Sequence, residues 1–194
     1  MTREGIVLET DRLEARRATV EDTSVFFQLW TNPKVMANVG FPSGLRITRE
    51  AIRARIQAEG DGVFDRLLVV GHKATGRALG ECLMARPGEA GIARTDIKLL
   101  PMFWGHGYGL EVKRGLLDYL FTHTDCVAVE ATPNVQNAAS IAMQEAVGGT
   151  RIGQAVHEFP ESMRDYTMPV HHYVYRVERE HWDPGRPARP ARKS

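Results

Sequence analysis

The clearest alternation of apolar and polar positions in the chain lies between residues 111 and 121. Apolar side chains recur there at positions i, i+4, i+5, i+8 and i+9, the spacing that one face of an α-helix presents. They are Val112, Leu116, Leu117, Leu120 and Phe121. Glu111, Arg114 and Asp118 fall on the opposite face. The pattern predicts an amphipathic helix that packs one side against a core.

Other segments predict the elements around this helix. Alternating apolar positions indicate strands, and apolar positions at helical spacing indicate helices. The expected strands span residues 6–18, 63–71, 78–86, 95–101, 126–133, 149–158 and 169–180. The other expected helices span 20–33, ending at Asn32-Pro33, 48–59, with Thr48 as N-cap, and 137–148, with Asn137 as N-cap and Gly148 as C-cap. This order predicts a mixed α/β sheet of about seven strands with about four helices on its two faces.

The composition is typical of one globular domain. The chain has 194 residues, of which 43% are hydrophobic, enough to bury a core. The charged N-terminus lacks an apolar leader, and nowhere do about 18 apolar residues run together, so we expect a soluble, cytoplasmic protein. Cys82 and Cys126 each lie in an apolar run and are expected to be reduced core thiols. The histidines lack metal-binding spacing, so no metal is expected.

The formal net charge of +1 hides a basic C-terminal segment, residues 185–194, that contains no acidic residue. Its basic residues are Arg186, Arg189, Arg192 and Lys193. Such a segment could contact nucleic acid, but a solvated, disordered end is the simpler interpretation. We therefore expect a domain over residues 1–182, a disordered Pro/Arg-rich tail over 183–194, and neither nucleic acid nor membrane as a partner.

A glycine-rich loop precedes the central helix. Gly105, Gly107 and Gly109 occupy three of five consecutive positions. Glycine is favoured where the backbone needs a positive φ or where a ligand comes close, and free N–H groups at a helix start attract anions. The loop therefore indicates a phosphate-bearing ligand, with a glycine-rich turn that binds nothing as the alternative. It lacks the Lys-Ser or Lys-Thr of a P-loop, and Leu110 replaces the last glycine of a dinucleotide fingerprint.

The element order and three motifs resemble the Gcn5-related N-acetyltransferase (GNAT) superfamily over nearly the whole chain. The family signature [QR]-x-x-G-x-[GA] is matched at residues 104–109, except that Trp104 takes the first position. Phe103-Trp104 is usual in the branch that resembles ribosomal-protein N-terminal acetyltransferases of the RimJ/RimL type. Two more motifs of that branch are LETDRLEARRATVED at 8–22 and NAASIAMQEAVGG at 137–149. In the second, Ala146 and Gly149 replace the usual Lys and Phe.

The resemblance implies a mostly antiparallel sheet that splays at its centre, and acetyl-coenzyme A as co-substrate. The loop amides would bind the pyrophosphate, and pantetheine would lie like a strand between Leu99-Leu100 and residues 129–132. A main-chain N–H near Leu99-Leu100 would stabilise the oxyanion. Asn137 would cap its helix, bind pantetheine, or do both. The implied cofactor-binding residues are Leu99, Leu100, Trp104, Gly105, His106, Gly107, Tyr108, Gly109, Leu110 and Asn137.

The catalytic residues follow from the resemblance only in part. Many relatives place a tyrosine, as acid for the leaving thiol, on the helix after the gap, but Gln144 occupies that slot and leaves Ser140 as the candidate. Glu130, in the strand beside the gap, is the candidate base acting through water. A helix-surface hydroxyl and a solvated strand residue are the alternative interpretations of these two. His171 and His172 are second choices for the base.

The implied function is an N-acetyltransferase in which a primary amine attacks the thioester directly. The acceptor would be a protein N-terminus, an amino acid or an amine-bearing small molecule. An α-amine of pKa about 8 is roughly a tenth neutral at pH 7, whereas a lysine amine near 10.4 is neutral in about one molecule in 2,500. An α-amine acceptor therefore needs little help from a base to lose its proton. The alternative is a non-catalytic acyl-coenzyme A-binding or sensor protein on the same fold, and a homodimer is left open.

Overall fold

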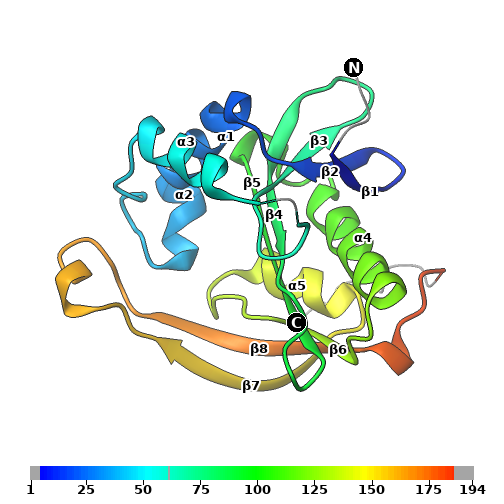
Figure 1. Ribbon diagram of the computed structural model, residues 1–194. Helices are drawn as coiled ribbons and strands as arrows, with labels where there is room; N and C mark the ends of the chain where they lie inside the picture. Colours follow the sequence, from blue (N-terminus) through cyan, green and yellow to red (C-terminus); the bar gives the residue numbers. More distant parts are fainter. Residues whose placement is uncertain (1–4, 61, 186–194) are drawn as a thin grey trace.

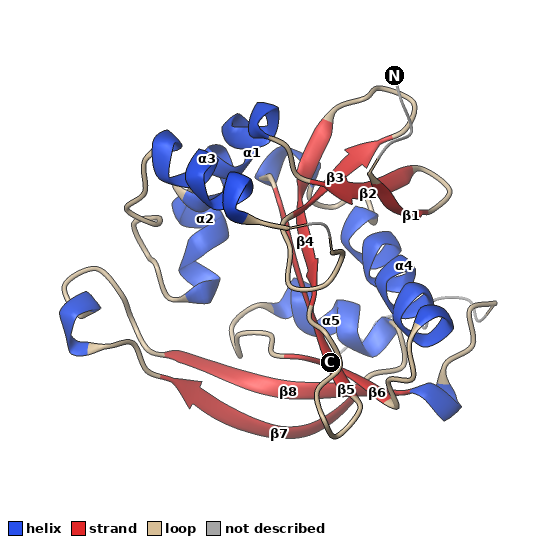
Figure 2. Cartoon of the chain, viewed as in Figure 1, coloured by secondary structure: helices blue, strands red, loops and turns tan. Residues whose placement is uncertain are grey.

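The computed structural model describes residues 5–60 and 62–185, and its centre is one sheet of eight strands (Figures 1 and 2). The strands are β1 (Ile6–Glu9), β2 (Leu13–Arg17), β3 (Leu68–His72), β4 (Ala78–Met84), β5 (Ile92–Leu99), β6 (Ala128–Ala131), β7 (Thr150–His157) and β8 (Val170–Glu178). They lie in the order β1-β2-β3-β4-β5-β6-β8-β7. All neighbours are antiparallel except β5 and β6. The predicted mixed, mostly antiparallel fold is confirmed.

Five α-helices in the described part of the chain cover the two faces of this sheet (Figure 1). They are α1 (Thr23–Trp30), α2 (Pro33–Met36), α3 (Arg49–Ala58), α4 (Tyr108–His123) and α5 (Ala138–Ala146). Val69 of β3 packs with α1 to α3, whereas its neighbours Leu68 and Val70 pack with α4. Successive strand residues point to opposite faces, so one strand contributes to two cores. Cys82 and Cys126 are buried, free thiols, as predicted.

The expected elements differ from the observed ones at two places near the N-terminus. The first expected strand is two strands, because the chain turns at Thr10, whose N–H donates to the Leu13 carbonyl at 2.8 Å and whose hydroxyl accepts from the Leu13 N–H at 3.1 Å. Pro33 begins α2 instead of only ending α1, because proline is tolerated at a first helical position and the Asn32 side chain caps the helix. The described residues therefore hold eight strands and five α-helices, against about seven and four expected.

The sheet opens between β5 and β6. Their parallel pairing covers three residue pairs and ends at Arg94. β5 nevertheless stays paired with β4 as far as Leu99. The expected gap is therefore present, between residues 95–99 and the segment from Ala131 onward. The prediction that it starts at Val129 is wrong, because Val129 still belongs to the paired part of β6.

The last two strands form a long hairpin beyond the gap (Figure 2). β7 is its edge strand, and all eight β7 residues are exposed. The connection from β7 to β8 reaches back to the segment after α2. The Met168 N–H donates to the Gly40 carbonyl at 2.9 Å, and the Phe41 and Phe159 rings meet edge to face with centroids 5.2 Å apart. The hairpin is thus tied to the helices on the other side of the gap.

The described chain ends shortly after β8. The Trp182 indole N–H donates to Asp118 of α4 at 2.7 Å, and its ring lies against Phe121. Most of the predicted tail, residues 186–194, lies outside the described residues. Among the helices that are described, none is both long and apolar enough to span a membrane.

Candidate functional site

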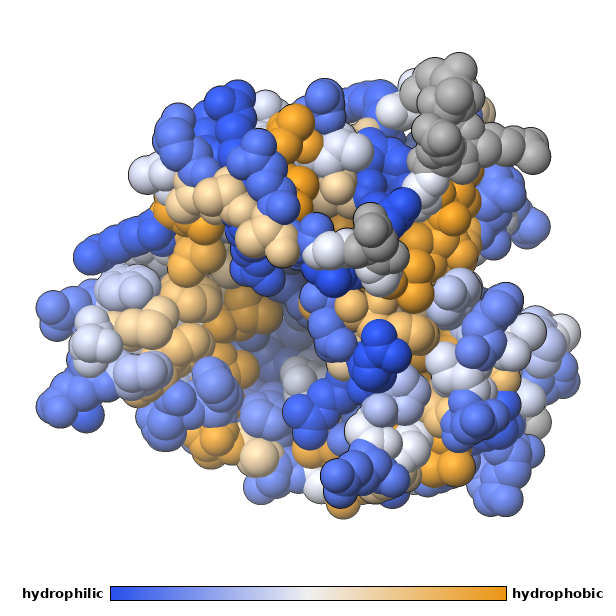
Figure 3. Space-filling view, viewed as in Figure 1, coloured by the Kyte–Doolittle hydropathy of each residue, from blue (hydrophilic) through white to orange (hydrophobic). Residues whose placement is uncertain are grey.

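A cavity of about 610 Å³ occupies the gap between β5 and β6, and it opens into the hollow seen in Figure 3. Its wall is built by residues 95–99 of β5, the loop before α4, residues 131–134 after β6, and one face of α5. The segment of Val35, Asn38 and Val39 completes the lining. The cavity is therefore a consequence of the strand divergence, and five segments of the chain line it, the third of which in sequence order runs from the glycine loop into α4 as far as Lys113.

The glycine loop forms one end of this cavity. Gly105 and Gly107 have φ values of +79° and +78°, which confirms that two of the three glycines supply positive φ. Gly107 is the N-cap of α4, and Gly109 lies in the first turn, where an added Cβ would meet the Met143 sulfur at 3.5 Å. The N–H groups from Gly105 to Leu110 have no acceptor in the part of the chain that the structure describes. Such a run of free donors at a helix start has the hydrogen-bonding capacity and the polarity that an anion requires.

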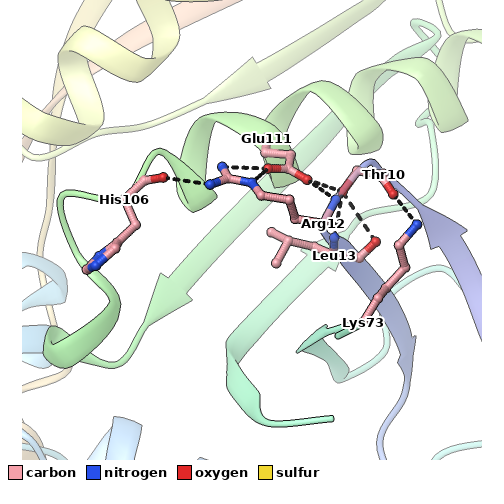
Figure 4. A network of polar contacts seen from close by, with 6 residues as sticks. All are labelled: Thr10, Arg12, Leu13, Lys73, His106 and Glu111. Atoms are coloured by element: carbon pink, nitrogen blue, oxygen red, sulfur yellow. Dashed lines mark hydrogen bonds and ion pairs between the residues drawn. The ribbon is translucent and has the colours of Figure 1, made fainter. Parts of the chain in front are cut away.

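A polar network braces this loop against the turn between β1 and β2 (Figure 4). Arg12 donates to the His106 carbonyl at 3.2 Å and pairs with Glu111 of α4 at 2.7 Å, while Thr10 donates to the same carboxylate at 2.6 Å. The Arg12 guanidinium also lies over the Tyr108 ring, 4.6 Å from its centroid. Burial alone would raise the pKa of Glu111, but the hydrogen bonds from Thr10 and Arg12 lower it. Thr10 and Arg12 of this network belong to the sequence motif at 8–22, but the spacing of that motif did not indicate that they contact the glycine loop and α4.

The predicted residues on α5 meet the cavity. Asn137 is the N-cap of α5, as predicted, and its side-chain oxygen accepts the Ser140 N–H at 3.1 Å. Both residues line the cavity, as does Gln144, which is buried. Their shared position brings the candidate acid Ser140 to the same space as the glycine loop.

Two residues predicted to bind cofactor do not line the cavity. Leu100 packs in the core with α1 to α3, and its N–H donates to the Leu79 carbonyl of β4 at 2.9 Å. Successive N–H groups of a strand point to opposite edges, so Leu99 is the residue whose N–H faces the gap. Its carbonyl accepts the Trp104 indole N–H at 2.8 Å. The second residue is His106. Its carbonyl accepts the hydrogen bond from Arg12, and its ring stacks on the Tyr108 ring outside the cavity lining.

The candidate bases lie apart from the lining. Glu130 is buried in the paired part of β6 and accepts two hydrogen bonds from Arg176 of β8, at 2.7 and 3.1 Å. His171 and His172 lie at the start of β8, also away from the cavity wall. Within the described residues, no three His, Cys, Asp or Glu side chains gather in a way that could hold a metal ion.

Two lysines line the cavity, and their surroundings shift their pKa values in opposite directions. Lys98 lies 3.1 Å from Glu81 and also pairs with Asp96. Burial would lower the pKa of Lys98, but the charges of Asp96 and Glu81 raise it above the ordinary lysine value. Lys113 of α4 is only 1% exposed, and its amine donates to the Thr95 hydroxyl at 2.7 Å. Burial lowers the pKa of Lys113 to about 7, and Asp96 opposes only part of that shift.

Lys113 was missed by the sequence reasoning, although a signal existed. It lies three, four and seven positions before apolar residues of the predicted helix, which are Leu116, Leu117 and Leu120. Those intervals place it on the apolar face. A charged residue on the buried face of an amphipathic helix is a departure from the pattern that marks it for attention.

A family model described as an acetyltransferase (GNAT) domain matches residues 12–150. Two curated relatives from Bacillus align with most of the chain. The uncharacterized N-acetyltransferase p20 of Bacillus licheniformis is 27% identical over 149 residues, which cover 75% of this chain and 83% of p20. The uncharacterized protein YkkB of Bacillus subtilis (strain 168) is 30% identical over 170 residues, which cover 84% of this chain and 91% of YkkB.

Solved structures share the fold. An acetyltransferase (GNAT family) from Bacillus anthracis superposes with a TM-score of 0.74 and 18% identity, over 89% of this chain and 98% of that one. The spermidine N-acetyltransferase from Vibrio cholerae, solved in complex with CoA and spermine, superposes with a TM-score of 0.71 and 19% identity, over 88% of this chain and 97% of that one. At these identities the structures establish a common fold and no more.

Proposed function

Because the chain belongs to the acetyltransferase (GNAT) domain family, we propose that it is an acetyl-coenzyme A-dependent N-acetyltransferase that transfers the acetyl group to a primary amine. The observation that carries the proposal is the run of N–H groups from Gly105 to Leu110, which have no acceptor in the described chain and lie where the cavity meets α4. The pyrophosphate of coenzyme A matches that run in charge and in hydrogen-bonding capacity. Two residues of this run have a positive φ and are glycines, so no side chain of theirs stands in front of the N–H groups.

The gap supports a place for the pantetheine arm. From Thr95 to Leu99, β5 has a strand neighbour among the described residues on one edge only, so its other edge is open to pairing with an extended ligand. Asn137 uses its side-chain oxygen for the helix cap, which leaves its amide NH₂ as the donor for a ligand. Both roles considered for Asn137 are therefore compatible.

The charges of the cavity support a single amine as acceptor. Asp96 is the one carboxylate among the described residues that line it, and Asp96 is already paired with Lys98. A polyamine would need several unpaired carboxylates, so spermine, which one solved neighbour binds, is not the acceptor that we propose. An α-amine is neutral often enough to react without a strong base. The RimJ/RimL-type motifs favour a protein N-terminus, with an amino acid or small amine as further members of the class.

The proposed chemistry is a direct attack of the amine on the thioester. The nitrogen lone pair forms the C–N bond, the C–S bond breaks, and coenzyme A leaves as a thiolate. The Leu99 N–H would stabilise the oxyanion, and Ser140 would supply a proton to the thiolate. Glu130 would take the amine proton through water, from its place beside Arg176.

Peptides that carry both kinds of amine test the proposal. With acetyl-coenzyme A at pH 7, we expect thiol release and acetylation mainly at the N-terminus, because roughly 250 times more of an α-amine than of a lysine amine is neutral. Thiol release is followed with a chromogenic disulfide, and the modified amine is identified by mass spectrometry. The matched control is the same peptide with a blocked N-terminus.

Two results would contradict this expectation in different ways. Acetylation mainly on lysine would require a base stronger than those proposed. Coenzyme A binding without thiol release, across peptides, amino acids and aminoglycosides, would instead support the non-catalytic alternative.

Removal of either assisting group is expected to slow turnover moderately. Ser140→Ala and Glu130→Gln should each lower kcat by about 100-fold or less, the range of general acid–base assistance, with coenzyme A affinity retained. Steady-state kinetics and calorimetry measure the two quantities. Because Glu130 also holds Arg176, the Arg176→Met variant is the control: an equal loss of kcat there would assign Glu130 a structural role instead.

A further inference from the structure

The two lysines of the cavity differ in their partners more than in their location. The Lys98 amine has two carboxylates beside it, those of Glu81 and Asp96. The Lys113 amine has the Thr95 hydroxyl and, among the described residues, no carboxylate within ion-pair distance. Its three donors therefore face a single uncharged acceptor. The more distant charge of Asp96 offsets only part of the cost of burying the positive charge of Lys113.

The place of Lys113 in the fold puts that amine next to the gap. Thr95 is the first β5 residue beyond the paired part of β5 and β6. Lys113 reaches it from α4, and both residues line the cavity. The α5 residues Met143 and Gln144 line the same space. The Lys113 side chain is thus shielded from bulk water, its amine bonds to Thr95 at the start of the gap, and the residue lines the cavity in which an acyl thioester would lie.

We propose that Lys113 is an internal acyl acceptor, which takes the acetyl group from a thioester held in the same cavity and becomes Nε-acetyl-lysine. The proposal rests on the proposed function, because that function brings the thioester to the cavity. It adds a modification site and a second, intramolecular product to the reaction. Lys98 is the internal comparison, since it borders the same cavity as a paired cation.

The step balances without any further reactant. The Lys113 Nζ lone pair attacks the thioester carbonyl carbon, a C–N bond forms, and the C–S bond breaks. Coenzyme A leaves as a thiolate and takes up the proton that Nζ releases, which yields the free thiol. The product is an amide, which does not pass its acetyl group to another amine under mild conditions, so the modified side chain accumulates.

The protonation state of Lys113 supports the proposal. With a pKa of about 7, half of the amine is neutral at neutral pH, compared with about one molecule in 2,500 for an ordinary lysine. The neutral fraction is what attacks a carbonyl carbon. In Lys98 the carboxylates raise the pKa and keep the amine charged, so its neutral fraction is smaller still.

Peptide mapping after incubation with acetyl-coenzyme A, in the absence of any acceptor, tests this directly. At pH 7.5 we expect an added acetyl group on Lys113, formed at least about 100-fold faster than on Lys98. The matched controls are Lys113→Met, which should lose that modified peptide and no other, and coenzyme A without an acetyl group. Coenzyme A binding is measured in parallel by calorimetry on the same full-length chain.

The outcomes separate this inference from the proposed function. If coenzyme A binds and Lys113 stays unmodified, or is modified no faster than Lys98, the inference is overturned, and thiol release with the peptide acceptors decides the proposed function separately. If coenzyme A does not bind, the proposed function fails, and labelling with p-nitrophenyl acetate decides the remaining question. Preferential labelling of Lys113 by that ester would support an internal acyl acceptor, and labelling of exposed lysines alone would overturn it.

Discussion

Exchange of Gly107 for valine is expected to lower the affinity for coenzyme A by at least about 100-fold, or about 3 kcal/mol, in a protein that still folds. Gly107 has a φ of +78°, a conformation that β-branched residues rarely adopt, and it is the residue from which α4 begins. A valine would shift the N–H groups that face the cavity and place methyl groups beside them. Calorimetric titration with coenzyme A measures the loss.

The control for this variant is the same change at Gly76. That glycine has a φ of +67° and lies in the turn between β3 and β4, where a Cβ would have no heavy atom within 4 Å apart from its chain neighbours. Gly76→Val should therefore incur a similar backbone strain, of order 1–3 kcal/mol in stability, with unchanged coenzyme A affinity. Equal affinities for Gly107→Val and the parent protein would remove the loop from the proposed site.

Exchange of Lys113 for methionine is expected to stabilise the protein, most strongly at low pH. The folded pKa of about 7 is below the unfolded value of about 10.4, so between these values the unfolded chain binds more protons and the stability of the parent protein rises with pH. The burial penalty is complete below pH 7 and absent above about pH 10.4. Methionine removes it, so the gain in unfolding free energy should approach about 4 kcal/mol at pH 6 and vanish near pH 10.

Urea titrations at several pH values measure this gain, and Lys98→Met is the matched control. Lys98 has a raised pKa, and its removal leaves the buried carboxylate of Glu81 with one polar partner among the described residues, the Trp30 indole N–H at 2.9 Å. The control should therefore lower stability at neutral pH. A Lys113→Met gain that does not depend on pH would show that packing, and not a buried charge, is responsible.

The local chemistry of the chain could be predicted from its sequence. Helix starts are set by neighbouring residues, and the caps expected at Thr48 and Asn137 are both present. The positive φ of Gly105 and Gly107 follows from the same kind of local reasoning. Because a glycine loop and the helix after it depend on few distant contacts, the conformation of the proposed anion site could be predicted from the sequence.

The parts that could not be predicted depend on contacts between distant segments. Glu130 is held by Arg176, 46 positions away, so no local pattern distinguishes it from a solvated residue. The edge of the gap depends on where the pairing of β5 with β6 stops, which is a property of two strands together. The environment of Lys113 depends on two features, its place on the apolar face of α4 and its contact with Thr95 of β5. Only the first of these could be predicted from the sequence.

The short ladder between β5 and β6 has a mechanical consequence. Among the described residues it is the one backbone ladder that joins β1 to β5 with β6 to β8, and it is three residue pairs long. Few backbone hydrogen bonds of the sheet therefore join these two halves. An extended molecule bound along residues 95–99 would add hydrogen bonds across the gap and so restrain one half against the other. Thermal denaturation would then report occupancy of the gap, with a midpoint that rises with the logarithm of ligand concentration.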